Sequence, residues 1–406
     1  MKINIPKQVE TALKILHTNS FEAYIVGGCV RDSILSLSPS DWDITTSAKP
    51  EEISCCFYGY RTIETGIKHG TITVIIDKMQ IEITTYRIDG EYSDNRRPDS
   101  VLFTDSIQFD LKRRDFTINA LAYNKSGIID LFGGIYDIEN KTIRCVGDPD
   151  ERFNEDGLRI LRALRFASVL NFGIEKNTSN SIHKNKNLLN NISEERINTE
   201  FNKLIMGSNY QKIILEYRDI IEVFLPEISF FNQDELEYRI NSMKSLSSLI
   251  LRITILLYKV ESPDDLLSRL KYDNSTIKTV KLLTSNIDKK VEPEPVNIKR
   301  WLHNLNYVNL YKLINIKKAL FESEYESLIS SEKILKEIID TNQCYSLKTL
   351  AITGQDIIDL GVPKGKNIGR ILNKILDEVI EGKLQNEKNG LLNYIYVNLE
   401  ALCSKS

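Results

Sequence analysis

Two aspartates that flank a tryptophan, Asp41 and Asp43, carry the strongest chemical signal in this sequence. They lie in "DWDITT", whose β-branched residues predict a strand. Side chains two positions apart project from the same face of a strand, so both carboxylates would face one side and Trp42 the other. Oxygen ligands of this kind suit Mg²⁺, which commonly bridges carboxylates to substrate phosphates. The spacing therefore predicts a magnesium site on one strand face.

A glycine pair lies just upstream, in "AYIVGGCVRD". The pattern predicts a strand that ends at Gly27 and Gly28, then a short helix whose N-terminal amides and Arg31 face the turn, with Asp32 beside them. Amide groups at such a turn bind phosphate oxygens. Together with the two aspartates, the turn predicts a nucleoside triphosphate held against two metal ions for in-line phosphoryl or nucleotidyl transfer.

A third acid is expected on a neighbouring strand. The best placed candidate is Glu82, in the strand-like segment "QIEITTYR". The alternative is that this glutamate only points outward into solvent, as most strand glutamates do.

The segment "LKRRDFTINALAY" places two arginines beside a carboxylate, Arg113 and Arg114 next to Asp115, with Asn119 one turn further on if the segment is helical. Guanidinium groups clamp phosphate oxygens, and a carboxylate or amide holds a ribose hydroxyl. Taken alone, the cluster is also typical of a surface ion-pair group at the start of a helix.

In "EDGLRILRALRFA", Asp156 and Arg159 are three residues apart and would share one face of a helix, which Arg162 and Arg165 continue as a basic stripe. Such a face is ordinarily only solvated. Cytosine and adenine, however, each present an amino donor beside a ring-nitrogen acceptor, and uracil and guanine reverse that order. An aspartate that accepts beside an arginine that donates would therefore select C and A.

Five motifs in this order resemble the class II tRNA nucleotidyltransferases, the CCA-adding enzymes, and their poly(A) polymerase relatives in the polymerase β superfamily: "GGCVRD…DWDITT", "RRDFTINALAY", "DLFGGIYDI", "GDPDERFNEDGLRILRALRFA" and "ISEERINTEF". The resemblance implies addition of CCA to the 3′ end of tRNA from CTP and ATP, with release of pyrophosphate. It assigns nucleotide contact to Arg113 and base pairing to Asp156 and Arg159. Glu155 would orient this pair, and Arg162 and Arg165 would assist.

A polar segment at 87–103, "RIDGEYSDNRRPDSVLF", carries Arg96 and Arg97 between Gly90 and Pro98. By composition it could be an ordinary surface loop. In the family, a flexible loop at this place is needed for the final A, so its presence favours A addition. The motifs leave open an A-adding enzyme that works with a separate CC-adding partner.

The fold class that follows is α+β, in a seahorse shape that the resemblance implies. Residues 1–147 would form an α/β nucleotidyltransferase head with a mixed polymerase β-like sheet, because short β-branched segments are punctuated there by glycine. Long helical patterns then predict an all-α neck (148–225), body (226–292) and tail (293–406). In the tail, "GVPKGKNIGRIL" places Lys364, Lys366 and Arg370 at a helix start, which suits either tRNA backbone contact or simple helix capping.

Composition sets outer limits on the function. The chain has 406 residues, 42% of them hydrophobic, and a net charge of -3, so nucleic-acid binding would depend on local patches. Six scattered cysteines and four histidines predict neither disulfides nor a zinc site. No apolar run is long enough to span a bilayer, and we expect a cytoplasmic enzyme that needs neither membrane nor protein partner.

Poly(A) polymerase is disfavoured because a long basic C-terminal extension is lacking, and intact Asp41 and Asp43 disfavour a catalytically silent RNA-binding protein.

Overall fold

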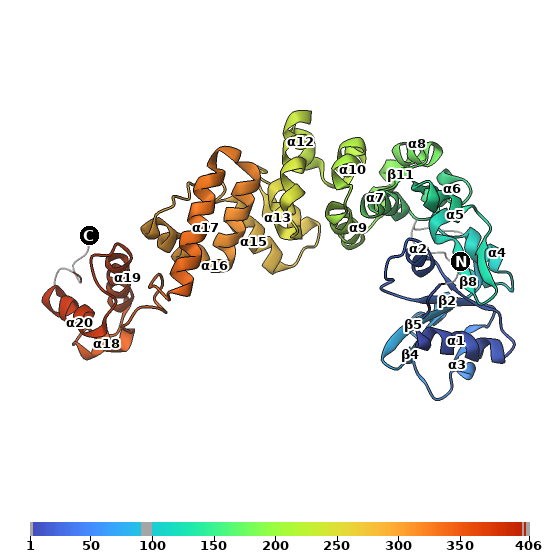
Figure 1. The fold of residues 1–406 in the computed structure, drawn as a ribbon, viewed down its shortest axis with the longest axis horizontal. Coiled ribbons are helices and arrows are strands. Elements are labelled where there is room, and N and C mark those ends of the chain that lie inside the picture. The colour runs from blue at the N-terminus through green and yellow to red at the C-terminus, as the bar shows by residue number, and fades with distance from the viewer. Residues whose placement is uncertain (1–2, 91–99, 400–401, 403–406) are drawn as a thin grey trace. The chain divides into compact units, whose positions relative to one another are not determined.

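The computed structural model describes residues 3–90, 100–399 and 402. The chain divides into two compact units, Met1–Leu236 and Glu237–Ser406 (Figure 1). The first unit holds the predicted head and neck segments, and the second holds most of the predicted body and the tail. The exact limits of the four predicted domains stay a prediction.

A seven-stranded sheet forms the centre of the head, in the order β3-β4-β5-β2-β1-β8-β9. Neighbouring strands are antiparallel except β2 and β5, which run parallel, so the sheet is mixed as predicted. The strands are β1 (Ala23–Val26), β2 (Asp43–Thr46), β3 (Arg61–Ile63), β4 (Thr71–Ile76), β5 (Met79–Thr85), β8 (Leu121–Asn124) and β9 (Gly127–Asp130). β4 alternates half-buried with buried residues, which shows that one face of the sheet packs into the core.

Short helices connect the strands of the head: α1 (Lys7–Thr18), α2 (Gly28–Ile34), α3 (Pro50–Cys56), α4 (Ile107–Lys112), α5 (Gly134–Glu139) and the 3₁₀ turns η1 (Ile67–His69) and η2 (Thr117–Asn119). A separate hairpin pairs β6 (Arg87–Asp89) with β7 (Val101–Phe103). These two strands flank residues 91–99, which lie outside the described residues. Arg96, Arg97 and Pro98 of the predicted loop are among them.

Helices replace strands after the head. The neck segment contains α6 (Pro149–Glu155), α7 (Leu158–Leu170), α8 (Lys176–Asn185), η3 (Lys186–Asn191), α9 (Glu194–Met206), α10 (Tyr210–Glu216), α11 (Arg218–Phe224) and η4 (Pro226–Phe230). A parallel pair of two-residue strands, β10 (Thr142–Ile143) and β11 (Gly173–Ile174), ties it to the head. Gly207 lets α9 end against α7, because a Cβ there would lie 2.2 Å from Ser168 Oγ.

The second unit is helical throughout the part that the structure describes. Its elements are α12 (Gln233–Ser242, which crosses the boundary), η5 (Met243–Ser245), α13 (Leu249–Leu256), α14 (Pro263–Arg269), α15 (Asn274–Thr284), α16 (Pro295–Leu320), η6 (Glu322–Glu324), α17 (Tyr325–Asp340), α18 (Gly354–Asp359), α19 (Lys366–Ile380) and α20 (Lys388–Val397). α16 is kinked at Asn306, where φ is 62°. Among the described helices, none combines the length and apolar character needed to cross a membrane.

Candidate active site

The glycine turn has the conformation that the sequence predicted. β1 ends at Val26, one residue before the pair, and α2 starts at Gly28. Gly27 has φ 81° and ψ -132°, a region that side chains strongly disfavour. A Cβ on Gly27 would also lie 2.9 Å from Arg114 Nη1. Glycine is therefore required here by the backbone, and a side chain would also displace the Arg114 guanidinium group.

The two aspartates lie at the entry to β2. The strand begins only at Asp43, so the prediction that both aspartates lie within it is wrong. Asp41 precedes the strand, is exposed and accepts a hydrogen bond from Ser40 Oγ at 2.9 Å. Trp42 is 6% exposed between the two, so the indole is buried, whereas Asp41 is exposed and Asp43 is half-buried.

Glu82 lies on the strand next to Asp43. β5 pairs with β2 in parallel, and the register places Glu82 opposite Asp43. Burial raises the pKa of Asp43 from 3.8 to about 6, and the negative charges of Glu82 and Asp41 add to this rise while Arg114 opposes it. Three acids thus act on one another at this edge of the fold.

These acids fit a hydrated magnesium ion better than a closed metal cage. In the part of the chain that the structure describes, no three His, Cys, Asp or Glu side chains already converge on a common point. Mg²⁺ keeps several waters and needs only one or two protein carboxylates plus substrate phosphates. The oxygen-only donors Asp41, Asp43 and Glu82, with mutual repulsion that a cation would relieve, satisfy that requirement.

The arginine of the turn is buried and fully engaged. Arg31 donates through Nη1 to Asn119 Oδ1 at 2.5 Å and through Nε to Asp32 Oδ1 at 2.9 Å. Its guanidinium carbon lies 4.9 Å from the centre of the Phe166 ring. Asp32 and Asn119, both predicted as supporting residues, therefore hold Arg31 in place behind the glycine turn.

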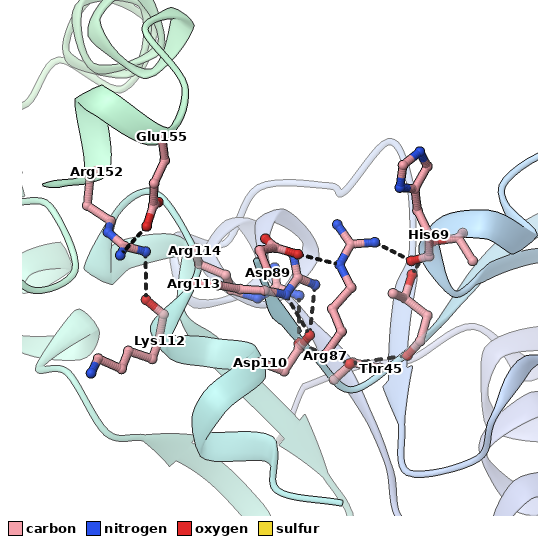
Figure 2. A network of polar contacts seen from close by, with 12 residues as sticks. Thr45, His69, Arg87, Asp89, Asp110, Lys112, Arg113, Arg114, Arg152 and Glu155 are labelled. Carbon is pink, nitrogen blue, oxygen red and sulfur yellow. Dashed lines mark hydrogen bonds and ion pairs between the residues drawn. The ribbon is translucent and has the colours of Figure 1, made fainter. Parts of the chain in front are cut away.

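The two adjacent arginines share the Asp110 carboxylate but have different further neighbours. Arg113 donates to Asp110 Oδ1 from Nε (3.0 Å) and Nη2 (2.7 Å), and its Nη1 lies 3.6 Å from Asp89 Oδ2 (Figure 2). Arg114 lies against Gly27 and acts electrostatically on Asp43. Arg114, predicted only as a supporting residue, is thus the one directed at the turn and the acids, whereas Arg113 faces the base of the loop.

Asp110, which the sequence analysis did not single out, anchors both arginines. It is completely buried in α4 and also accepts from Thr45 Oγ1 at 3.0 Å (Figure 2). Burial alone would raise the pKa of Asp110, but Arg113 and Arg114 lower it below its ordinary value. Asp110 therefore stays charged beneath β2.

The segment that follows α4 is not one helix. α4 ends at Lys112, and residues 117–124 form η2 and then β8. Asn119 still reaches Asp115, because its Nδ2 donates to Asp115 Oδ1 at 3.0 Å. Asp115 Oδ2 accepts from Arg162 Nε at 2.8 Å. Burial would raise the pKa of Asp115, but Arg162 and Asn119 hold it well below its ordinary value.

The proposed base-reading residues do not share one helix, which corrects the prediction. α6 ends at Glu155 and α7 begins at Leu158, so Asp156 lies in the break. Asp156 Oδ1 caps α7 by accepting from Leu158 N at 3.0 Å. Its Oδ2 accepts from Arg196 Nη2 at 2.7 Å.

Arg196 lies in the quoted motif "ISEERINTEF" but had no assigned role. Its pairing with Asp156 spans 40 positions of the sequence. No periodicity or local spacing reports a contact of that kind, so only the fold reveals it.

Arg159, in the first turn of α7, is fixed by three groups. Its Nη1 pairs with the Glu155 carboxylate and donates to the Arg152 carbonyl at 3.2 Å. Its Nη2 donates to the carbonyl of Arg113 at 3.1 Å. Glu155 also pairs with Arg152 (Figure 2). Glu155 therefore contacts Arg159 as expected, whereas Asp156 takes its partner from α9.

The remaining basic stripe of α7 is an ion-paired layer. Arg165 Nε lies 2.5 Å from Glu200 Oε2, and its guanidinium carbon lies 3.8 Å from the centre of the Phe166 ring. Arg162 bridges Asp115 and Glu200, the latter at 3.9 Å. Side-chain exposure of 33% for Arg162 and 15% for Arg165 excludes the alternative of an ordinary solvated face.

The tail residues lie in the second unit. Lys364 and Lys366 are exposed around the start of α19, and Arg370 is half-buried one turn further on. Gly365 precedes the helix. The turn and helix start match the sequence prediction, and the role in RNA binding stays a prediction.

A glycine turn beside paired acids on a mixed sheet, followed by a helical arginine and aspartate layer, defines a nucleotidyltransferase of the polymerase β type. Family models agree: a poly A polymerase head domain matches residues 23–144, a probable RNA and SrmB-binding site of polymerase A matches 171–231, and a putative tRNA nucleotidyltransferase domain 2 matches 244–395.

Comparison with individual proteins narrows the class. The chain is 38% identical to the CCA-adding enzyme of Ligilactobacillus salivarius over 96% of both chains, and 36% identical to that of Enterococcus faecalis over 96% of this chain and 95% of that one. The crystal structure of the Bacillus stearothermophilus CCA-adding enzyme in complex with CTP superposes with a TM-score of 0.82 at 28% identity, covering 97% of this chain and 98% of that one. The chain belongs to the class II CCA-adding enzymes.

The fold extends to more distant enzymes. The Thermotoga maritima CCA-adding enzyme complexed with tRNA has a TM-score of 0.68 at 21% identity, covering 98% of this chain and all of that one. At this identity the match concerns the fold alone.

Proposed function

We propose that this enzyme joins nucleotides to tRNA with Mg²⁺ held by Asp41 and Asp43, assisted by Glu82. As a CCA-adding tRNA nucleotidyltransferase, it adds CCA to the tRNA 3′ end. The observation that carries the metal assignment is the register of β2 and β5, which places Glu82 opposite Asp43. Bound Mg²⁺ would supply a lowered pKa for the attacking hydroxyl and charge stabilisation for departing pyrophosphate.

Separate groups of residues in the chain would bind the triphosphate and the base. The Gly27–Gly28 turn and Arg114 face the acids and would bind the triphosphate, with Arg31 shaping the turn from behind. Asp156 and Arg159 would hold the edge of cytosine or adenine, positioned by Arg196 and Glu155.

The substrates that we assign are CTP, ATP and tRNA. Solved relatives include a CCA-adding enzyme in complex with CTP and another with tRNA. In this chain, exposed Lys364 and Lys366 with Arg370 would contact the tRNA backbone. A cytoplasmic location stays a prediction.

The experiment that tests this assignment measures addition to three tRNA transcripts, ending before CC, after C and after CC, with CTP and ATP singly and together. We expect Asp41→Ala and Asp43→Ala to abolish addition at every step while tRNA affinity is kept, because the carboxylates hold the metal rather than the RNA. Asp77→Asn is the control, since Asp77 is exposed at the β4–β5 turn of the same sheet and its φ of 47° suits asparagine. Near-normal turnover of either alanine variant would remove the metal assignment.

A further inference from the structure

An open cavity lies in the second unit, lined by residues of α15, of the turns after it and of α16. Its volume is about 350 Å³, within the range of cavities that hold small ligands. One wall is formed by residues 282, 286 and 289, which lie at helical spacing on α15 and the turns after it. The other follows residues 297, 300, 301, 304 and 305, which share one face of α16 before its kink.

The aromatic member of this wall is Trp301, one of two tryptophans in the chain. The indole is half-buried, and its Nε1 donates to the carbonyl of Lys290 at 3.4 Å. The ring is therefore held at one edge while it lines the cavity. A fixed indole of this kind offers a face on which any nucleobase can stack.

Amide groups surround the indole. Asn286 is buried, and its Oδ1 accepts from Lys289 Nζ at 2.8 Å. Asn297 uses its Oδ1 for the backbone N–H of Glu292 at 3.1 Å, which turns its NH₂ group away from that bond. Asn304 is exposed on the same face as Trp301. Asn286 Nδ2 donates to the Leu282 carbonyl at 2.7 Å, so Asn286 fixes Lys289, and Asn297 and Asn304 are the carboxamides that would bond to the edge of a base.

The charge of the cavity has one sign. Among the described residues that line it, Lys289 and Arg300 are cationic and none carries a carboxylate. Arg300 pairs through Nη2 with Glu381 Oε1 at 2.5 Å, but its side chain remains 56% exposed, so other N–H groups face solvent. An anionic group beside a flat, hydrogen-bonding ring fits this arrangement, which is the chemistry of a nucleotide.

We propose that this cavity binds one unstacked nucleotide of the tRNA substrate, with its base against Trp301 and its phosphate at Lys289 and Arg300. The proposal rests on the proposed function, because it takes tRNA as the RNA that reaches this unit. It adds a tRNA contact in the second unit that is distinct from the tail lysines.

The test compares Trp301→Ala and Trp301→Phe with the wild-type enzyme. We expect Trp301→Ala to raise the Kd and KM for tRNA about 5- to 100-fold, the loss typical of one base stack. Because the cavity does no chemistry, kcat and the KM for CTP should not change. Trp301→Phe keeps a ring and should retain most of the affinity, and circular dichroism melts of both variants report whether they fold.

Lys289→Ala is a second, independent test of the cavity, and this substitution does not alter the core. We expect it to weaken tRNA binding and to lower the slope of log Kd against log salt by about one, as for one lost phosphate contact. Lys281→Ala is its matched control, because this substitution also removes one positive charge. Lys281 lies on α15, lines another cavity and pairs with Asp264. Equal effects of the two lysine variants would overturn the proposal in favour of general electrostatic attraction.

The outcomes separate this proposal from the function on which it rests. Wild-type addition of CCA with unchanged tRNA affinity in Trp301→Ala would refute the cavity alone. Failure of the wild-type enzyme to extend tRNA would refute the function, and the tRNA affinities would still report on the cavity. Saturable quenching of Trp301 emission by AMP or CMP, without any effect of Trp301→Ala on tRNA binding, would identify a free nucleotide as the occupant and overturn the proposal.

Discussion

Asp43→Asn is expected to stabilise the metal-free enzyme while it destroys activity. Burial and the neighbouring acids raise the pKa of Asp43 from 3.8 to about 6. At neutral pH the folded protein therefore holds a carboxylate in a place that disfavours its charge. Asparagine has nearly the same shape and carries no charge, so the substitution removes that penalty and leaves the packing of β2 in place.

The sign and size follow from proton linkage. Between pH 3.8 and about 6 the folded state binds more protons at Asp43 than the unfolded state does, so stability falls as pH rises through this window. A displacement from 3.8 to about 6 corresponds to about 3 kcal/mol, because one pKa unit is worth about 1.4 kcal/mol. The stability gain of Asp43→Asn should be near zero below pH 4, grow through pH 4–6 and stay near 3 kcal/mol above it.

Trp42 is the natural probe, because it lies next to Asp43 and is buried in the same unit. In a Trp301→Phe background its emission reports unfolding of the first unit alone, which avoids treating two units as one transition. Urea titrations in EDTA at pH 4, 5, 6 and 8 give the difference between variant and parent. Added Mg²⁺ should stabilise the parent at pH 8 and leave the variant unchanged. A difference that does not vary with pH would refute the reasoning, since it would show that Asp43 carries no charge penalty in the fold.

Three further changes test other parts of the site. Gly27→Ala places a Cβ 2.9 Å from Arg114 Nη1 at φ 81°, so we expect a loss of about 1–3 kcal/mol in urea unfolding and at least a tenfold fall in kcat/KM for CTP. Arg196→Ala removes the charged hydrogen bond to Asp156 and should reduce the preference for CTP over UTP about 10- to 100-fold, measured as a ratio of kcat/KM, whereas an unchanged ratio would show that Arg196 does not position the base-reading carboxylate. Deletion of residues 90–98 should leave C addition largely intact and cripple addition of A to tRNA ending in CC; equal loss of both would indicate general damage to the head.

The parts of the site that follow from local pattern were predictable. Strand alternation and β-branched residues located β2 and β5, and the glycine pair located the turn before α2. The placement of Glu82 opposite Asp43 needed only the expectation that two such strands are neighbours, which the parallel pairing confirms. The strands and the turn depend on residues within a few positions of one another, where side-chain direction is fixed by the backbone.

The errors arose where tertiary contacts override helical periodicity. The Asp156–Gly157 pair is a recognised breaker signal that the regular spacing of the arginines concealed. A Cβ on Gly157 would lie 3.0 Å from the carbonyl oxygen of Leu188, so the close packing against η3 favours glycine at the break. Asp110 did leave a local signal, because it precedes Arg113 and Arg114 by three and four residues, the spacing of ion pairs on a helix; its complete burial is what the sequence did not show.

The residues that we propose to read the base are connected to the glycine turn by two routes of contacts. Arg159 is bonded to the carbonyl of Arg113, whose neighbour Arg114 lies on Gly27. A second route runs from Arg162 through Asp115 to Asn119, and from there to Arg31 of α2.

Buried charged networks of this kind are costly to leave partly paired, so they favour discrete rearrangements over gradual distortion. When the site changes from cytosine to the larger adenine, we therefore expect the reading residues and the turn to shift together. Asp89 contacts Arg113 at 3.6 Å from the strand that leads into residues 91–99. That contact connects β6, the strand before the predicted loop, to the same network, which gives a physical reason for expecting the loop to act on A addition while the acids at β2 serve every step alike.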